Sequence, residues 1–236
     1  MNLPDLPAKL MLQAKAICEM GLRLERLGYV HGTTGNISVK VPFEGQPCFM
    51  ITPTDACLGQ LDPARLALVD ASGEQRFGDR ASKTLALHRK IYEADLTALA
   101  VIHTHSHHLV LLTLLGVWRE EEILPPITPY QVMKVGRVPL IPYALPGDPE
   151  VANAVANVID MALEQGERLR AVMCDRLGPQ VWHEDLGKAG AVLEELEQTA
   201  RLWLDGQRQP GQLTDPRISP LSPAQLAALR ERFPNP

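Results

Sequence analysis

The sequence predicts a single α/β domain, because helical and strand patterns alternate along its 236 residues with no long linker before residue 206. A hydrophobic share of 45% indicates a chain that can bury a sizeable core, which excludes intrinsic disorder and fibrous folds. The composition changes after residue 204, where Pro, Gln, Asp and Arg become frequent. We therefore expect a domain over residues 1–204 and a C-terminal arm over 205–236 with one short helix.

The first expected elements are a helix and a hairpin. Apolar residues at helical spacing predict a helix over residues 7–28 that ends with Gly28 as its C-cap. After a turn-rich loop at 32–35, two short strands are expected over Asn36–Val41 and Phe49–Thr52, joined by a turn over Pro42–Pro47. This pattern is typical of a β-hairpin.

The centre of the chain predicts a helix followed by a buried strand. Ser82 is a suitable N-cap for a helix that runs to about Ala94, with Leu87 and Ile91 on its buried face. The apolar run Leu99–His103 predicts the strand. The remaining elements are a strand over Val138–Tyr143, a Pro-Gly-Asp-Pro turn at 146–149 leading into a helix to about Gln165, strands over Arg170–Cys174 and Gln180–His183 on either side of a turn at Gly178-Pro179, and a helix over Leu186–Leu204.

Charge and cysteine content exclude several classes of protein. The chain carries 23 basic and 28 acidic residues, a net charge of −5, and its basic residues are scattered, so nucleic acid is not an expected partner. The run His108–Trp118 is too short to cross a bilayer, and the first ten residues lack the pattern of a secretory signal, so we expect a cytoplasmic protein without membrane contact. The four cysteines have no metal-binding spacing and are expected to be buried free thiols: Cys18, Cys48, Cys57 and Cys174.

The densest concentration of chemistry is the motif HTHSHH at residues 103–108. If the preceding strand continues through it, His103 and His105 point to the same face, because strand side chains alternate. Two imidazoles suit Zn²⁺, Mn²⁺ or another first-row metal, although further ligands must come from elsewhere. The alternative is a pair of hydrogen-bonded histidines at a strand end.

A second constellation combines GTTGNIS at 32–38 with TPTD at 52–55 and Ser82-Lys83. Gly-rich turns with hydroxyl side chains present backbone N–H groups, and a lysine adds positive charge, so the set suits a small phosphate or carboxylate. The alternative for the first stretch is an ordinary loop into a strand.

Taken in order, six stretches give the chain a resemblance to the class II aldolase and adducin-head family. They are GTTGNISVKVP, MITPTDACLGQLDP, ASKTLALHRKIY, AVIHTHSHH, ITPYQVMKVGRVPLIPYALPGDP and EELEQTARLWL. The resemblance spans residues 8–204, and TPTDACLGQLDP, TPYQVMKVG, PLIPYALPGDP and the tail SPAQLAALRERF look most like the branch of 3-oxo-tetronate 4-phosphate decarboxylases.

The resemblance implies a three-layer α/β/α domain with a central, mainly antiparallel sheet, assembled as a homotetramer with sites between subunits. It also implies a divalent metal held by three histidines, which polarises a substrate carbonyl. By the resemblance, His103 and His105 occupy two ligand positions, and Tyr130 reaches a neighbour's site as a proton donor. Five residues fall on or beside the phosphate cradle: Gly35, Asn36, Thr54, Ser82 and Lys83.

The chain departs from the family pattern at three positions. Leu177 stands where the family has its third histidine, Thr84 where it has a catalytic glutamate, and Asp55 where it has a glycine of the cradle. We expect Thr84 to be in the site without acting as the usual acid or base, and Asp55 to place a like charge near a bound phosphate. Among the other histidines, His88 is expected to pack behind the site, His107 or His108 could swing in as a ligand, and His183 is expected to be exposed.

These features predict a metal-dependent carbon–carbon lyase, of aldolase or decarboxylase type, that acts on a small phosphorylated sugar acid or oxo-acid such as 3-oxo-tetronate 4-phosphate. Two alternatives remain open. One is a non-catalytic paralogue that keeps the oligomeric scaffold with a degenerate metal site, and the other is a metal-free binding module for an anion.

Overall fold

A computed structural model describes residues 8–145, 147–207 and 220–232. Its centre is an eight-stranded sheet with the strand order β4-β3-β2-β1-β5-β8-β7-β6. The strands are β1 Asn36–Phe43, β2 Gln46–Ile51, β3 Ala67–Asp70, β4 Gln75–Phe77, β5 Ala100–His103, β6 Leu140–Ile141, β7 Ala171–Cys174 and β8 Gly178–His183. Neighbouring strands are antiparallel except β6 and β7, so the sheet is mainly antiparallel as predicted.

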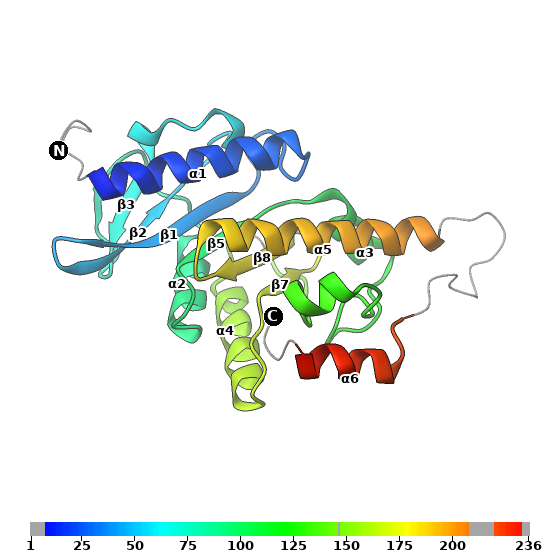
Figure 1. The fold of residues 1–236 in the computed structure, drawn as a ribbon. Helices are drawn as coiled ribbons and strands as arrows, with labels where there is room; N and C mark the ends of the chain where they lie inside the picture. Colours follow the sequence, from blue (N-terminus) through cyan, green and yellow to red (C-terminus); the bar gives the residue numbers. More distant parts are fainter. Residues whose placement is uncertain (1–7, 146, 208–219, 233–236) are drawn as a thin grey trace.

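Helices cover both faces of this sheet, which gives the predicted three layers (Figure 1). The helices are α1 Ala8–Arg26, α2 Leu85–Ala94, α3 His107–Leu115, α4 Pro149–Glu164, α5 Leu186–Gln207 and α6 Pro223–Arg232, with short turns η2 Leu58–Gln60, η3 Pro63–Arg65 and η4 Gln131–Val135. Ile102 packs with α1, α3 and α5, whereas its neighbour Val101 packs with α2 and α4. Because side chains alternate between the two faces of the sheet, the strands contribute to two separate apolar cores.

The N-terminal helix and the hairpin are confirmed. Gly28 has a φ of 74°, and the amide of Tyr29 donates to Leu24 while that of Gly28 donates to Glu25, the hydrogen-bond pattern of a Schellman C-cap. In the hairpin, Phe43 pairs with Gln46, so the turn is the two-residue loop Glu44–Gly45 and both strands are longer than expected. Positive φ angles at both turn residues match a twisted hairpin.

Several element bounds differ from the sequence prediction. The turn expected at Gly178-Pro179 lies instead at residues 175–177, where Arg176 has a φ of 60°, and Gly178 begins β8. Helix α2 begins at Leu85 with Thr84 at its N-cap position, two residues after the predicted N-cap Ser82, whose hydroxyl oxygen accepts the amide of Thr84. Its buried face contains Ile91 as expected, while Leu87 is only half-buried. The strand expected over Val138–Tyr143 is only the two residues of β6.

Three elements were not predicted. Strands β3 and β4 extend the sheet beyond the hairpin, and α3 begins four residues after β5 ends. The arm helix is confirmed as α6, which packs beside η4, and the amide of Leu221 donates to Pro126. The parts of the arm at 208–219 and 233–236, Pro146 of the predicted turn and residue 7 of the predicted first helix lie outside the described residues.

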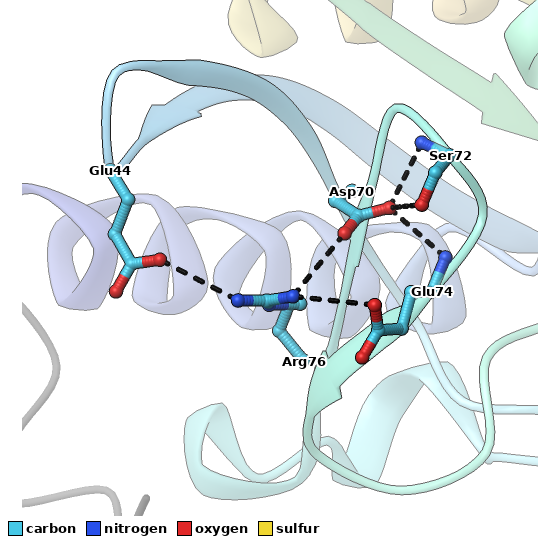
Figure 2. A network of polar contacts seen from close by, with 5 residues as sticks. All are labelled: Glu44, Asp70, Ser72, Glu74 and Arg76. Carbon is cyan, nitrogen blue, oxygen red and sulfur yellow. Dashed lines mark hydrogen bonds and ion pairs between the residues drawn. The ribbon is translucent and has the colours of Figure 1, made fainter.

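A polar network ties the β1–β2 turn to the β3–β4 turn (Figure 2). The Arg76 guanidinium lies 3.6 Å from carboxylate oxygens of Glu44 and Asp70 and 3.4 Å from Glu74. Asp70 also accepts the backbone amides of Ser72 and Glu74. The network holds the outer strands together at the edge of the sheet, far along the chain from the histidine motif.

The four cysteines are free thiols, as predicted. Cys48 and Cys174 are buried, but Cys18 and Cys57 are only half-buried. Cys18 packs at the margin of the apolar core, and the Cys57 thiol donates to the Glu25 carboxylate. Within the described residues, no helix has the length and apolar character needed to span a membrane.

Candidate metal and anion site

Strand β5 ends at His103, whose side chain is buried on the face covered by α2. Its Nδ1 lies 2.9 Å from the carbonyl oxygen of Pro179, and because a carbonyl can only accept, Nδ1 carries the proton. Burial, and to a lesser degree the nearby His105, lower the pKa of His103 to about 4. The imidazole is therefore neutral at pH 7, with Nε2 free as a lone-pair donor.

His105 joins His103 by a route that differs from the prediction. The strand does not continue to His105, because the chain leaves β5 after His103 and turns into α3. The two rings nevertheless lie side by side, with centroids 5.0 Å apart. Two imidazoles that share a tetrahedral zinc ion at ordinary Zn–N distances have centroids about 5 Å apart. The pair is therefore spaced as two ligands of one metal ion would be.

Two glycines bring further loops against the histidine segment. A Cβ on Gly178 would overlap the carbonyl oxygen of Thr104, so only glycine permits the turn before β8 to approach this closely. On the other side, a Cβ on Gly35 would lie 2.8 Å from the carbonyl oxygen of His103. The first contact brings Leu177 to the segment, and the second brings the loop that begins at His31.

Leu177 adds no donor to the pair. It is half-buried and packs against the apolar cluster on the α2 and α4 side of the sheet. Within the described residues, no three His, Cys, Asp or Glu side chains are grouped closely enough to hold a metal ion as they stand. His31, which the sequence analysis did not single out, is the next imidazole, with its ring centroid 6.4 Å from that of His105.

His88 packs behind the site, as expected. It is fully buried, and its Nδ1 lies 2.8 Å from the Ser38 hydroxyl, which in turn lies 2.7 Å from the Tyr92 hydroxyl. Burial, and after it the nearby His103, lower the pKa of His88 to about 3, while the Gln180 side chain acts in the opposite direction. A neutral His88 beneath His103 keeps positive charge away from the place where a cation would bind.

The other histidines lie outside the pair. His107 and His108 begin α3, where their rings contact each other and His108 Nδ1 donates to Glu197. A swing of His108 into the site would therefore break a bond to a carboxylate that is only 3% exposed. His183 is half-buried rather than exposed, because it pairs with Ala100 inside the sheet, at the opposite end of the β5–β8 ladder. Its Nδ1 accepts the amide of Glu184.

Backbone pairing draws three segments of the expected anion cradle together. Thr52 exchanges hydrogen bonds with Ile37, and its carbonyl accepts the amide of Ser82. The amide of Thr54 donates to Arg80, next to a bridge between Pro53 and Ala81. Beside these contacts lie Asn36 and its neighbour Gly35, and the Asn36 Oδ1 is buried without a hydrogen-bond partner. Because an amide oxygen only accepts, this buried orphan calls for a hydrogen-bond donor such as a hydroxyl group of a ligand.

The remaining cradle candidates differ in exposure. Lys83 is exposed and Thr84 is half-buried at the start of α2. Asp55 is exposed with a φ of 55°, a conformation that favours glycine. From Thr54 and Asp55 an open groove of about 510 Å³ extends to η2 and η3, and two residues that sequence analysis missed, Arg65 and Arg80, line it.

Tyr130 lies apart from these groups in the chain's own fold. Its side chain is 62% exposed, and it directly precedes η4, which packs on α5 and α6. Its expected role at a neighbouring subunit's site remains a prediction.

Comparison with known proteins places this geometry in a family. The model of the class II aldolase and adducin N-terminal domain matches residues 15–204. The chain belongs to the class II aldolase and adducin family. The match spans the sheet, the histidine pair, helices α2 to α4, and most of α1 and α5.

Three relatives resemble the chain over most of its length. The 3-oxo-tetronate 4-phosphate decarboxylase of Cupriavidus necator is 50% identical over 195 residues, which cover 83% of this chain and 85% of the relative. The L-fuculose phosphate aldolase of Escherichia coli is 28% identical over 222 residues, 93% of each chain. The crystal structure of YgbL from Escherichia coli has a TM-score of 0.81 at 34% identity and covers 94% of this chain and 99% of YgbL. These class II aldolase relatives include carbon–carbon lyases of both the decarboxylase and the aldolase type.

Of three ligand positions for a divalent cation, two carry side chains that can bind it and the third does not. His103 offers a buried, oriented, neutral imidazole, and His105 offers a second at the spacing of a shared ion. Catalytic zinc sites have three protein ligands, and Leu177 cannot supply one. The site as it stands is a two-imidazole site with one apolar side.

Proposed function

We propose that this chain is a carbon–carbon lyase of the decarboxylase type that acts on a small phosphorylated 3-oxo acid, such as 3-oxo-tetronate 4-phosphate. The observation that carries this proposal is the preorganised pair His103 and His105, in a chain that is 50% identical to a protein named as this decarboxylase. A cytoplasmic location and an assembly of four copies belong to the same proposal.

Decarboxylation is compatible with a site that has Thr84 in place of the family's glutamate. When a 3-oxo acid releases CO₂, the electron pair of the broken bond moves to the neighbouring carbonyl as an enolate, and a proton is then added at carbon. No carboxylate base has to abstract a proton first, so Thr84 in place of a glutamate is tolerated. A divalent cation, Zn²⁺ or Mn²⁺, supplies Lewis acidity to the oxygen that gains charge.

The chain's own residues bind and orient the substrate. Asn36, Thr54, Ser82 and the Gly35 backbone receive the phosphate, with Lys83 adding positive charge. The bond to Pro179 keeps Nε2 of His103 directed away from the sheet. Tyr130 of a neighbouring copy delivers the proton to carbon, a role that the exposure of its side chain in the single chain leaves open.

A second function is favoured by one observation, the apolar side of the site. With Leu177 in place of a donor, the chain could keep the family scaffold and bind an anion without turnover. Metal content and CO₂ release distinguish the two functions. We expect the full chain, supplied with Zn²⁺ or Mn²⁺, to release CO₂ from 3-oxo-tetronate 4-phosphate, and His103→Ala to abolish the release. A wild type that releases none with either metal contradicts the lyase.

Leu177→His should raise zinc affinity, because it adds an imidazole to two that are already placed. We expect a gain of at least about tenfold, the lower limit for groups that merely orient a ligand. Competition with a chromophoric chelator measures it, and Leu177→Gln serves as the matched polar control. Equal zinc affinity in Leu177→His and wild type would show that position 177 does not face the metal.

A further inference from the structure

We propose that His31 is the third metal donor of this chain and takes over the role that Leu177 cannot fill. This inference rests on the proposed metal site at His103 and His105. It assigns a ligand from the loop before β1, on the opposite side of the histidine segment from the turn that carries Leu177.

The loop that carries His31 is fixed at its backbone. The amide of His31 donates to the Thr34 hydroxyl oxygen at 3.0 Å, and the hydroxyl donates back to the His31 carbonyl at 2.7 Å. The Thr34 amide donates to the same carbonyl. At the end of the loop, Gly35 lies against the carbonyl of His103 with no room for a side chain. The position of the His31 backbone relative to β5 is therefore well defined.

The His31 side chain needs only a small movement. Its ring lies edge-on to His105, with centroids 6.4 Å apart, against about 5 Å for two imidazoles that share a tetrahedral ion. His31 is exposed and its ring has no hydrogen-bond partner among the described residues, so a rotamer change of this size is inexpensive. A shift of about 1 Å brings the His31 ring to the spacing at which it and His105 would share one ion.

Zinc titration of the full chain tests the inference without an activity assay. We expect wild type to bind about one Zn²⁺ per chain and His31→Ala to bind at least about tenfold more weakly. His107→Ala is the matched control, since His107 is also exposed and lies two residues beyond His105, and its affinity should equal that of wild type. With Co²⁺ as the ion, His31→Ala should also lose the intense visible absorption of a tetrahedral site.

A second test asks whether a histidine at position 177 restores the zinc affinity that His31→Ala loses. The double variant His31→Ala/Leu177→His should regain the wild-type zinc affinity, because it replaces one third imidazole by another. Because His31 is exposed, its alanine variant should unfold at the wild-type temperature. Equal zinc affinity in wild type and His31→Ala, or no zinc binding by wild type, overturns the assignment. Absence of CO₂ release alongside a weakened His31→Ala would instead refute the lyase and leave the metal site standing.

Discussion

Asp55 holds a backbone conformation that glycine adopts more easily, at the edge of the anion cradle. Its φ of 55° is tolerated by Asp but is costly for β-branched residues. Asp55→Gly should fold with near wild-type stability and lower the KM for the phosphorylated substrate by removing a like charge. Asp55→Val should lose about 1–2 kcal/mol. Urea unfolding and steady-state kinetics measure the two effects, and an unchanged KM in Asp55→Gly would place the phosphate elsewhere.

Asp70 gives the outer sheet a predictable pH dependence. Its hydrogen bond from the Ser72 hydroxyl is the main cause that lowers its pKa, with backbone amides and Arg76 acting in the same direction. Because the folded state holds this proton less tightly than the unfolded chain, the stabilisation is present above about pH 4 and is lost as the pH falls through the folded pKa.

Asp70→Asn should therefore lower the melting temperature at pH 7, and the difference from wild type should shrink below about pH 4. Thermal unfolding at pH 7, 5 and 3 measures it. Glu44→Gln, which meets the same Arg76 from a more exposed position, is the control and should have a smaller effect. A difference in melting temperature between Asp70→Asn and wild type that is the same at all three pH values would show that the Asp70 charge does not contribute.

At the scale of elements, Glu197 of α5 acts as the N-terminal cap of α3. Its carboxylate, 3% exposed, accepts the backbone amides of His108 and Leu109, whereas the local candidate Ser106 makes no capping bond. Glu197→Ala leaves these donors without partners and should cost about 2–3 kcal/mol of unfolding free energy. Glu194→Ala, on the same helix, removes a pair with the exposed Arg23 and should cost under about 1 kcal/mol. Equal losses in urea unfolding would exclude the capping role.

At the scale of the whole molecule, exposed apolar side chains support the proposed assembly. Leu114 and Leu115 at the end of α3 and Tyr130 before η4 are each more than half exposed. Sedimentation at micromolar concentration should give about four times the 26.0 kDa of one chain. Tyr130→Phe should keep that mass and lower kcat, because it removes only a hydroxyl. A sedimenting species of one chain would contradict both the assembly and the shared site.

Local patterns were enough to predict elements whose signals lie within their own residues. Helix α1 shows its apolar spacing and its Gly28 cap, and the hairpin shows two apolar strands around a short turn. The same holds for β5, where four consecutive residues are buried. Strand β4 was missed because it has only three residues and none of them is buried, and β3, which lies between β2 and β4, is defined by its pairing with those neighbours.

The sequence by itself determined the fold class, the family and the two histidines of the motif, because these depend on residue types in a fixed order. Tertiary structure alone decided how the motif is used. Helix α3 begins at His107, and its N-terminal amides are capped by Glu197, 89 residues beyond His108, which no local pattern can indicate. The neighbours of the histidine pair were decided in the same way: Gly35 and Gly178 permit two backbone contacts that no side chain allows, and those contacts place His31 on one side and Leu177 on the other.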